Sequence, residues 1–131
     1  MTAMRAGAAY FAAVFAIGFA LGTLRVFVLA PTFGEAGALM IELPVILFAS
    51  WVACAAIIIW LAVPAAIGAR ALMGAVAFAL LIAAEFALAI FGFGRSAAEE
   101  FARYATLLGA VGLAGQVLFA LFPVIQLTRR S

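Results

Sequence analysis

Apolar residues fill the chain in four long stretches, separated by short segments that hold Pro, Gly, Ser and most of the charges. Each stretch is about as long as the ~20 residues that an α-helix needs to cross the ~30 Å hydrocarbon core of a bilayer. We therefore predict an all-α integral membrane protein, a four-transmembrane-helix bundle with short loops. These spans leave no room for a soluble domain in 131 residues, so residues 1–131 are expected to form a single membrane domain. The expected spans are residues 6–30, 38–63, 70–92 and 103–128.

Helix boundaries are suggested by Pro and by two capping-box patterns. Pro31 is expected to stop the first helix, and the segments 32–35 and 96–99 each place Ser or Thr three residues before Glu. The second helix has two alternative starts, because Pro44 would also suit the first turn of a helix that begins near Glu42. If that helix begins at residue 32 instead, its first turns lie at the membrane interface and Pro44 is expected to kink it.

Composition supports the membrane class and narrows the chemistry. Hydrophobic residues make up 71% of the chain and charged residues 9%, far from the make-up of soluble domains. The chain has no His, and its acids are all Glu, so the usual zinc, non-haem iron and bis-His haem sites and the Ser-His-Asp triad cannot be assembled. We expect no cofactor, and the sequence leaves enzymatic activity undecided. Cys54, in the middle of a span, is expected to pack as a small apolar residue.

Charge distribution predicts an orientation. Cytoplasmic ends of spans collect Arg, so the side without acids is expected to be cytoplasmic, which places both termini in the cytoplasm of a bacterial-type inner membrane. The cytoplasmic set would be Arg5, Arg70, Arg129 and Arg130, and the opposite side would hold Arg95, Arg103, Glu35, Glu99 and Glu100. Tyr10 and Trp60 are expected in the cytoplasmic interfacial belt and Tyr104 in the outer one. The net charge of +2 includes no basic run, so no nucleic-acid partner is expected.

Four polar residues inside the spans are the candidate functional residues: Arg25, Glu42, Glu85 and Gln116. A charge at membrane depth costs several kcal/mol, so it is retained where it faces protein, water or a partner charge. At a rise of 1.5 Å per residue, Arg25 and Glu42 lie roughly 28 and 31 Å above the cytoplasmic ends of their spans. Glu85 and Gln116 lie roughly 22 and 18 Å above theirs. This predicts two polar layers in the outer half, with Arg25 long enough to reach down toward the deeper one.

Each of these residues shares its helical face with small residues, which mark where helices in lipid approach most closely. The pairings are Gly18 and Gly22 with Arg25, Ala49 and Ala56 with Glu42, Gly74 and Gly92 with Glu85, and Gly109 and Gly112 with Gln116. All four polar side chains are therefore predicted to point into the bundle. The alternative is an Arg25–Glu42 ion pair that only sets helix register, with Glu85 capped by Gln116.

Charge counting favours a functional site, because one Arg facing two carboxylates leaves an excess negative charge that a proton or a ligand can neutralise. We predict a small polytopic protein that binds or transports a small cationic or amphipathic ligand through the outer-half cluster of Arg25, Glu42, Glu85 and Gln116, with Glu85 as the titratable or ligand-binding carboxylate. Proton coupling is one form of this function. Two alternatives stay open: a non-catalytic accessory or assembly subunit of a larger membrane complex, and a membrane enzyme that acts on a lipid or isoprenoid with a Glu acid or base. The expected partners are membrane lipids and either further copies of the chain or a larger membrane complex.

Overall fold

The computed structural model describes residues 2–92 and 94–130, and within these ranges the chain is helical with no strand. The long helices are α1 (Thr2–Leu24), α2 (Ala30–Trp60), α3 (Ile67–Ala87) and α5 (Leu107–Arg130), α4 (Ala97–Arg103) is short, and π-helical segments occupy Arg25–Leu29 and Leu88–Gly92. The described residues include four stretches that are long and apolar enough to cross a membrane: Thr2–Leu29, Ala36–Trp60, Ile67–Gly92 and Leu107–Leu127. The prediction of an all-helical chain with four helices of spanning length is confirmed.

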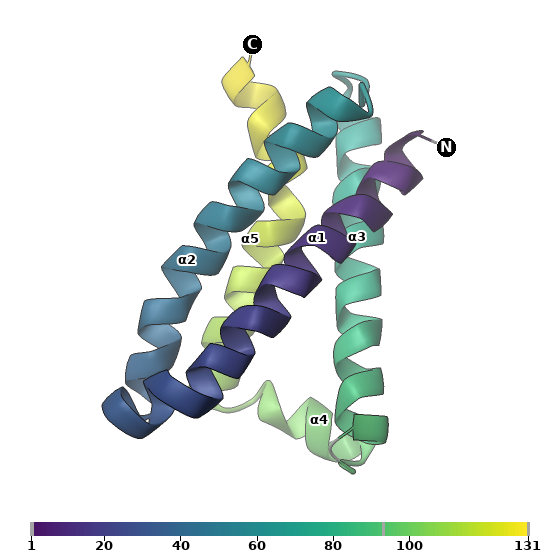
Figure 1. The fold of residues 1–131 in the computed structure, drawn as a ribbon. Coiled ribbons are helices and arrows are strands. Elements are labelled where there is room, and N and C mark those ends of the chain that lie inside the picture. The colour runs from purple at the N-terminus through teal and green to yellow at the C-terminus, as the bar shows by residue number, and fades with distance from the viewer. Residues whose placement is uncertain (1, 93, 131) are drawn as a thin grey trace.

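The four long helices alternate in direction, as in an up-down-up-down bundle (Figure 1). Both α1 and α5 pack against α2 and α3, so α1 and α5 lie diagonally opposite each other. The start of α1 and the end of α5 lie at the same end of the bundle as the α2–α3 turn (Figure 1). We call this the terminal end. The opposite end, where α4 connects α3 to α5, is called the α4 end.

The passage from the first span to the second differs from the expectation. The helical path continues through Pro31, whose missing N–H costs nothing in a first helical turn, and the backbone breaks at Gly34, with φ 78° and ψ 169°. Glycine adopts positive φ without the steric cost that other residues meet. Thr32 donates its hydroxyl to the carbonyl oxygen of Val28 at 2.9 Å instead of capping the second helix. The kink lies at Gly34 rather than at Pro44, which is accommodated inside α2.

Some side chains named in the sequence predictions lie outside the described residues. These are Glu35, Arg129 and Arg130.

The last predicted span, residues 103–128, and the segment before it form two separate helices, α4 and α5. The capping box at the start of α4 is confirmed: the Ser96 side chain accepts from the Glu99 N–H at 3.1 Å, and the Glu99 carboxylate accepts from the Ser96 N–H at 2.8 Å. The chain then turns after Arg103, where Thr106 donates to the Arg103 carbonyl at 2.7 Å and accepts from the Gly109 N–H at 3.0 Å. Thr106 thus caps α5, and α4 is separated from the spanning helix.

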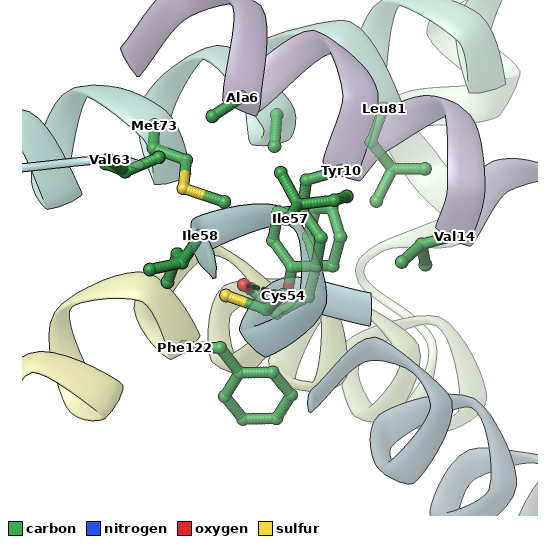
Figure 2. Close-up of a cluster of buried hydrophobic side chains, with 12 residues drawn as sticks. Ala6, Tyr10, Val14, Cys54, Ile57, Ile58, Val63, Met73, Leu81 and Phe122 are labelled. Carbon is green, nitrogen blue, oxygen red and sulfur yellow. Dashed lines mark hydrogen bonds between the residues drawn. The ribbon is translucent and has the colours of Figure 1, made fainter. Parts of the chain in front are cut away.

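The packed core lies in the terminal half of the bundle. Figure 2 shows side chains from α1, α2, α3 and α5 converging there, among them Ala6, Tyr10, Cys54, Met73 and Phe122. Cys54 is fully buried in this cluster, as expected for a thiol that packs as a small apolar group. The interfacial position expected for Tyr10 is wrong, because its side chain is fully buried.

Tyr10 is buried because α5 supplies a partner for its hydroxyl. Pro123 has no N–H, so the carbonyl oxygen of Phe119, four residues earlier, lacks its helical donor. The Tyr10 hydroxyl donates to that oxygen at 2.7 Å, and the Tyr10 ring stacks on the Phe119 ring with centroids 4.2 Å apart. Arg70 is also buried here and donates to the carbonyl oxygens of Pro64 at 3.2 Å and Pro123 at 3.1 Å.

Two glycines let the backbones of the long helices approach one another most closely, and both lie in the terminal half. A Cβ added at Gly74 would lie 2.0 Å from the carbonyl oxygen of Ala120, and one at Gly7 would lie 2.7 Å from that of Met73. At this end the backbone of α3 therefore lies directly against that of α1, at Gly7, and against that of α5, at Gly74.

The small-residue stripes predicted beside Arg25 and Gln116 do not mark close contacts between the long helices. Gly109 is tightly packed, since an added Cβ would lie 1.8 Å from the Arg103 carbonyl oxygen, but Arg103 is on the short helix α4. An added Cβ at Gly18 or Gly22 would meet ordinary van der Waals neighbours at 3.8 and 3.7 Å. At Gly112 it would meet no described atom within 4 Å. The helix contacts at Gly18, Gly22 and Gly112 are thus looser than those at Gly74 and Gly7.

Candidate functional site

The first predicted pair, Arg25 and Glu42, forms an ion pair near the α4 end. Arg25 begins a π-helical segment, and its Nη1 lies 2.7 Å from Oε2 of Glu42 on α2. The Arg25 side chain is 39% exposed and that of Glu42 is 11% exposed. This contact joins the end of the first span to the second and occupies the guanidinium that was expected to reach toward Glu85.

The second predicted pair, Glu85 and Gln116, is joined by a residue that the sequence did not identify as part of the site. The Tyr104 hydroxyl donates to Oε1 of Glu85 at 3.0 Å, and the amide nitrogen of Gln116 donates to Oε2 of Glu85. We call these three residues the Glu85 site. They come from three elements, α3, the turn after α4, and α5, so the site closes the α4 end of the bundle.

The two groups lie at neighbouring levels along the bundle. Leu43, which follows Glu42, packs over Gly115, which precedes Gln116: an added Cβ at Gly115 would lie 2.8 Å from the Leu43 side chain. Helices α2 and α5 run in the same direction, so Glu42 and Gln116 differ by only about two residues of helical rise. The predicted separation into two layers at different depths is wrong.

The depth prediction failed because it assumed that the spans end at the same level. Gln126, two residues from the predicted end of its span at Thr128, donates to the carbonyl oxygen of Trp51 at 2.9 Å. Trp51 is twelve residues from the predicted end of its own span at Val63. The ends of α2 and α5 are therefore staggered, which local sequence patterns do not report.

Gln116 has an unused hydrogen-bonding group. Its Oε1 is buried and has no hydrogen-bond partner among the described residues. A buried polar atom without a partner costs about 1–3 kcal/mol, and such atoms are rare in folded proteins. Rotating the amide would exchange the group that faces Glu85, but it would leave the other group without a partner.

An apolar groove of about 400 Å³ adjoins the Glu85 site. It lies between α3, α4 and α5, and its walls include Phe78, Ile82, Phe86, Phe101, Leu113 and the ring of Tyr104. Phe86 packs edge-on against Phe101, with ring centroids 5.3 Å apart. Tyr104 thus contributes its ring to the groove and its hydroxyl to Glu85.

A buried acid on α4 was also missed. Glu100 is 2% exposed and pairs with Arg95 at 3.3 Å and with Arg103 at 3.0 Å. The spacing of Glu100 and Arg103 is the signal that could have indicated the pair, although it does not distinguish a buried acid from a solvated one. Both contacts lie within residues 95–103, so they stabilise α4 and the loop that precedes it.

Tyr104 is a hydrogen-bond donor at neutral pH. It lies in the turn before α5, outside the spanning segments, and burial together with the neighbouring Glu85 carboxyl raises its pKa well above the usual value. The phenol therefore keeps its proton and can donate to Glu85 across the physiological pH range.

The described residues contain no group of three or more His, Cys, Asp or Glu side chains placed to hold a metal ion.

Comparison with models of known protein families, with curated proteins and with solved structures finds no match. The chemistry of the residues at the α4 end is thus the basis for a function.

Proposed function

We propose that the chain is a multi-pass protein of a bacterial-type inner membrane, with both termini in the cytoplasm. Four apolar helices of spanning length support insertion. Large apolar side chains such as Phe48, Trp60 and Phe91 are exposed along them, which would be a liability in water and is natural in lipid. Both termini lie at one end of the bundle, and Arg5 without neighbouring acids favours the cytoplasm for that end.

Within this membrane protein, Glu85 is the group that binds a small cationic or amphipathic ligand in exchange for a proton. The observation that carries the proposal is that both hydrogen-bond partners of Glu85, Tyr104 and Gln116, are neutral. Arg25 and Arg103, by contrast, pair with Glu42 and Glu100. A carboxyl group in an apolar setting is stable as the neutral acid or beside a positive charge, and a ligand can supply that charge.

The exchange balances in charge. In the empty site Glu85 is a carboxylic acid, and Gln116 can accept its proton in a hydrogen bond once the amide has rotated. When a cation arrives, the proton leaves to water, the carboxylate pairs with the cation, and the amide nitrogen of Gln116 donates to the carboxylate. Glu42 stays paired with Arg25 throughout, and that pair joins the end of the first span to α2.

The proposal is tested by binding to the purified protein in a neutral detergent. The probes are three amphipathic cations, dodecylamine, dodecyltrimethylammonium and tetraphenylphosphonium, measured by equilibrium dialysis. At least one should bind, more weakly as the pH falls, because the proton competes for Glu85. Glu85→Gln should abolish the binding, and Glu99→Gln, an exposed acid on α4, should retain it.

Two outcomes would overturn the proposal: no pH-dependent binding of any of the three cations, or unchanged binding in Glu85→Gln. If the protein instead purifies in a fixed ratio with a larger complex and binds none of the cations, the accessory-subunit alternative replaces the proposal.

If a cation does bind at Glu85, coupled transport is tested in vesicles, where an imposed proton gradient should drive uptake of that cation.

A further inference from the structure

We propose that the Glu85 site and the apolar groove together bind a single-chain amphiphile whose head group is an ammonium with N–H donors. This inference rests on the proposed function and adds the class of ligand. It follows from two features that the carboxylate alone does not explain: the unpartnered amide oxygen of Gln116 and the adjoining apolar groove.

The groove lies next to the Glu85 site along α3 and α5, and Tyr104 belongs to both. Phe78 and Ile82 lie seven and three residues before Glu85, which places them on nearly the same side of α3. Leu113 lies three residues before Gln116 on α5. Tyr104 lines the groove with its ring and reaches Glu85 with its hydroxyl. A ligand with its apolar part in the groove would reach Glu85 with its polar end by passing the Tyr104 ring.

The size and lining of the groove favour a ligand with a single hydrocarbon chain. Its volume of about 400 Å³ is in the lower part of the range for small-molecule pockets. Its walls are apolar side chains, with no polar group to orient a second head group. One alkyl or aryl chain suits this space better than the paired chains of a bilayer phospholipid.

The head group is identified by the hydrogen bonds left open at the site. A primary ammonium has enough N–H donors to bond both the Glu85 carboxylate and Oε1 of Gln116. It would therefore balance the charge of the carboxylate and give the buried oxygen of Gln116 a hydrogen-bond partner. A quaternary ammonium supplies the same charge but donates no hydrogen bond, so Oε1 would stay without a partner. Leaving a buried acceptor unsatisfied is costly, and the primary ammonium should therefore be preferred.

The head-group test compares dodecylamine with dodecyltrimethylammonium, which have the same chain. Binding to the purified protein is measured at equal mole fraction in the detergent micelle, so that partition into the micelle does not contribute. The primary amine should bind about tenfold more tightly. Gln116→Met keeps the length of the side chain and removes the acceptor, so it should bring the ratio of the two affinities close to one.

The second test asks whether the hydrocarbon chain of the ligand lies in the groove, by filling the groove with a larger side chain. Ala83 is exposed and lines the groove, so Ala83→Trp should occupy it and weaken dodecylamine binding by about fivefold or more. Ala75 is an exposed alanine on the same helix that does not line the groove. Ala75→Trp is the matched control and should bind within about twofold of the wild type.

Equal affinity for the two head groups, or a preference that survives Gln116→Met, would overturn the assignment of the head group. Unchanged binding in Ala83→Trp would overturn the assignment of the groove. In either case a cation still binds at Glu85 and the proposed function stands. If neither cation binds the wild type and tetraphenylphosphonium also fails, the proposed function itself is lost.

Discussion

The two ends of the bundle differ in how closely the helices pack and in whether their buried polar groups have partners. At the terminal end, glycines bring helix backbones into contact, and the polar groups of Tyr10 and Arg70 are satisfied by carbonyl oxygens. At the α4 end the backbone includes two π-helical segments, the core is thinner, and Glu85 and Gln116 are only partly buried. Among the described residues, the buried polar atom without a partner belongs to Gln116, at this end.

The difference indicates which end provides stability and which is free to bind. Close packing leaves little room for a ligand, because even one added methylene is felt in a dense core. Loosely packed regions with unsatisfied polar groups are where function is expected to override stability. Substitutions at the terminal end should therefore cost folding free energy, and those at the Glu85 site should alter binding.

The largest expected effect is from Gly74→Leu. Its side chain would collide with the backbone of Ala120, and the free energy of unfolding should fall by more than about 3 kcal/mol. SDS-induced unfolding in mixed micelles measures the change. Gly112→Ala is the matched control at the α4 end, where space is open, and it should be neutral or stabilising by up to about 1 kcal/mol. Similar losses from both variants would contradict a difference in packing between the ends.

Tyr10→Phe tests the satisfied polar core. It keeps the ring and removes the donor to Phe119, so the unfolding free energy should fall by about 1–3 kcal/mol. Pro123→Ala restores the N–H that can pair with the same carbonyl. In that background Tyr10→Phe should cost less than about 1 kcal/mol, as measured in a double-mutant cycle. An equal cost in both backgrounds would rule out the role assigned to Pro123.

Arg25→Gln tests the ion pair that borders the Glu85 site. It leaves Glu42 without its partner, but Arg25 is more than a third exposed, so the cost should be only about 1 kcal/mol. Adding Glu42→Gln should recover part of this loss, since no unpaired charge then remains. A double variant less stable than Arg25→Gln would show that the pair is not the source of the effect.

The smallest effect is expected at the solvent-facing start of α4. The Ser96 N–H and hydroxyl hold the pKa of Glu99 below its usual value, so this contact stabilises the helix above the unfolded pKa, about 4.3. The stabilisation is lost as the pH falls through the lower folded value. Hydrogen exchange of the peptide covering residues 97–103 should therefore speed up on acidification relative to the rest of the chain. Ser96→Ala should reduce that pH dependence.

Local patterns predicted the helices but not their register. The four spans follow from long apolar runs, and the Ser96 capping box is a contact within three residues. The stagger of α2 against α5 depends on contacts such as Gln126 with Trp51, which are 75 residues apart. No hydropathy pattern encodes such a pairing, so depths counted from span ends misplaced Glu42 relative to Gln116.

The same limit applies to individual residues. An interfacial Tyr and a buried Tyr look alike in sequence, and the carbonyl that allows Tyr10 to be buried is 109 residues away. The contact of Gln116 with Glu85 was predicted only in the alternative of a structural ion pair, in which Gln116 caps Glu85. Tyr104 was missed, since an aromatic residue at the end of a span is typical of an interfacial belt. The break at Gly34 was not predicted, because it depends on a positive φ that the sequence does not reveal and because Pro31 was the more obvious helix breaker.

The exchange of a proton for a cation at Glu85 is tested most directly by infrared difference spectroscopy. Spectra of the purified protein are recorded with and without dodecylamine at neutral pH. The expected result is the loss of one protonated carboxyl band and the gain of a carboxylate band on binding, with no such change in Glu85→Gln. Dodecylamine binding that leaves the carboxyl bands unchanged, or that gives the same difference spectrum in Glu85→Gln, would contradict the exchange.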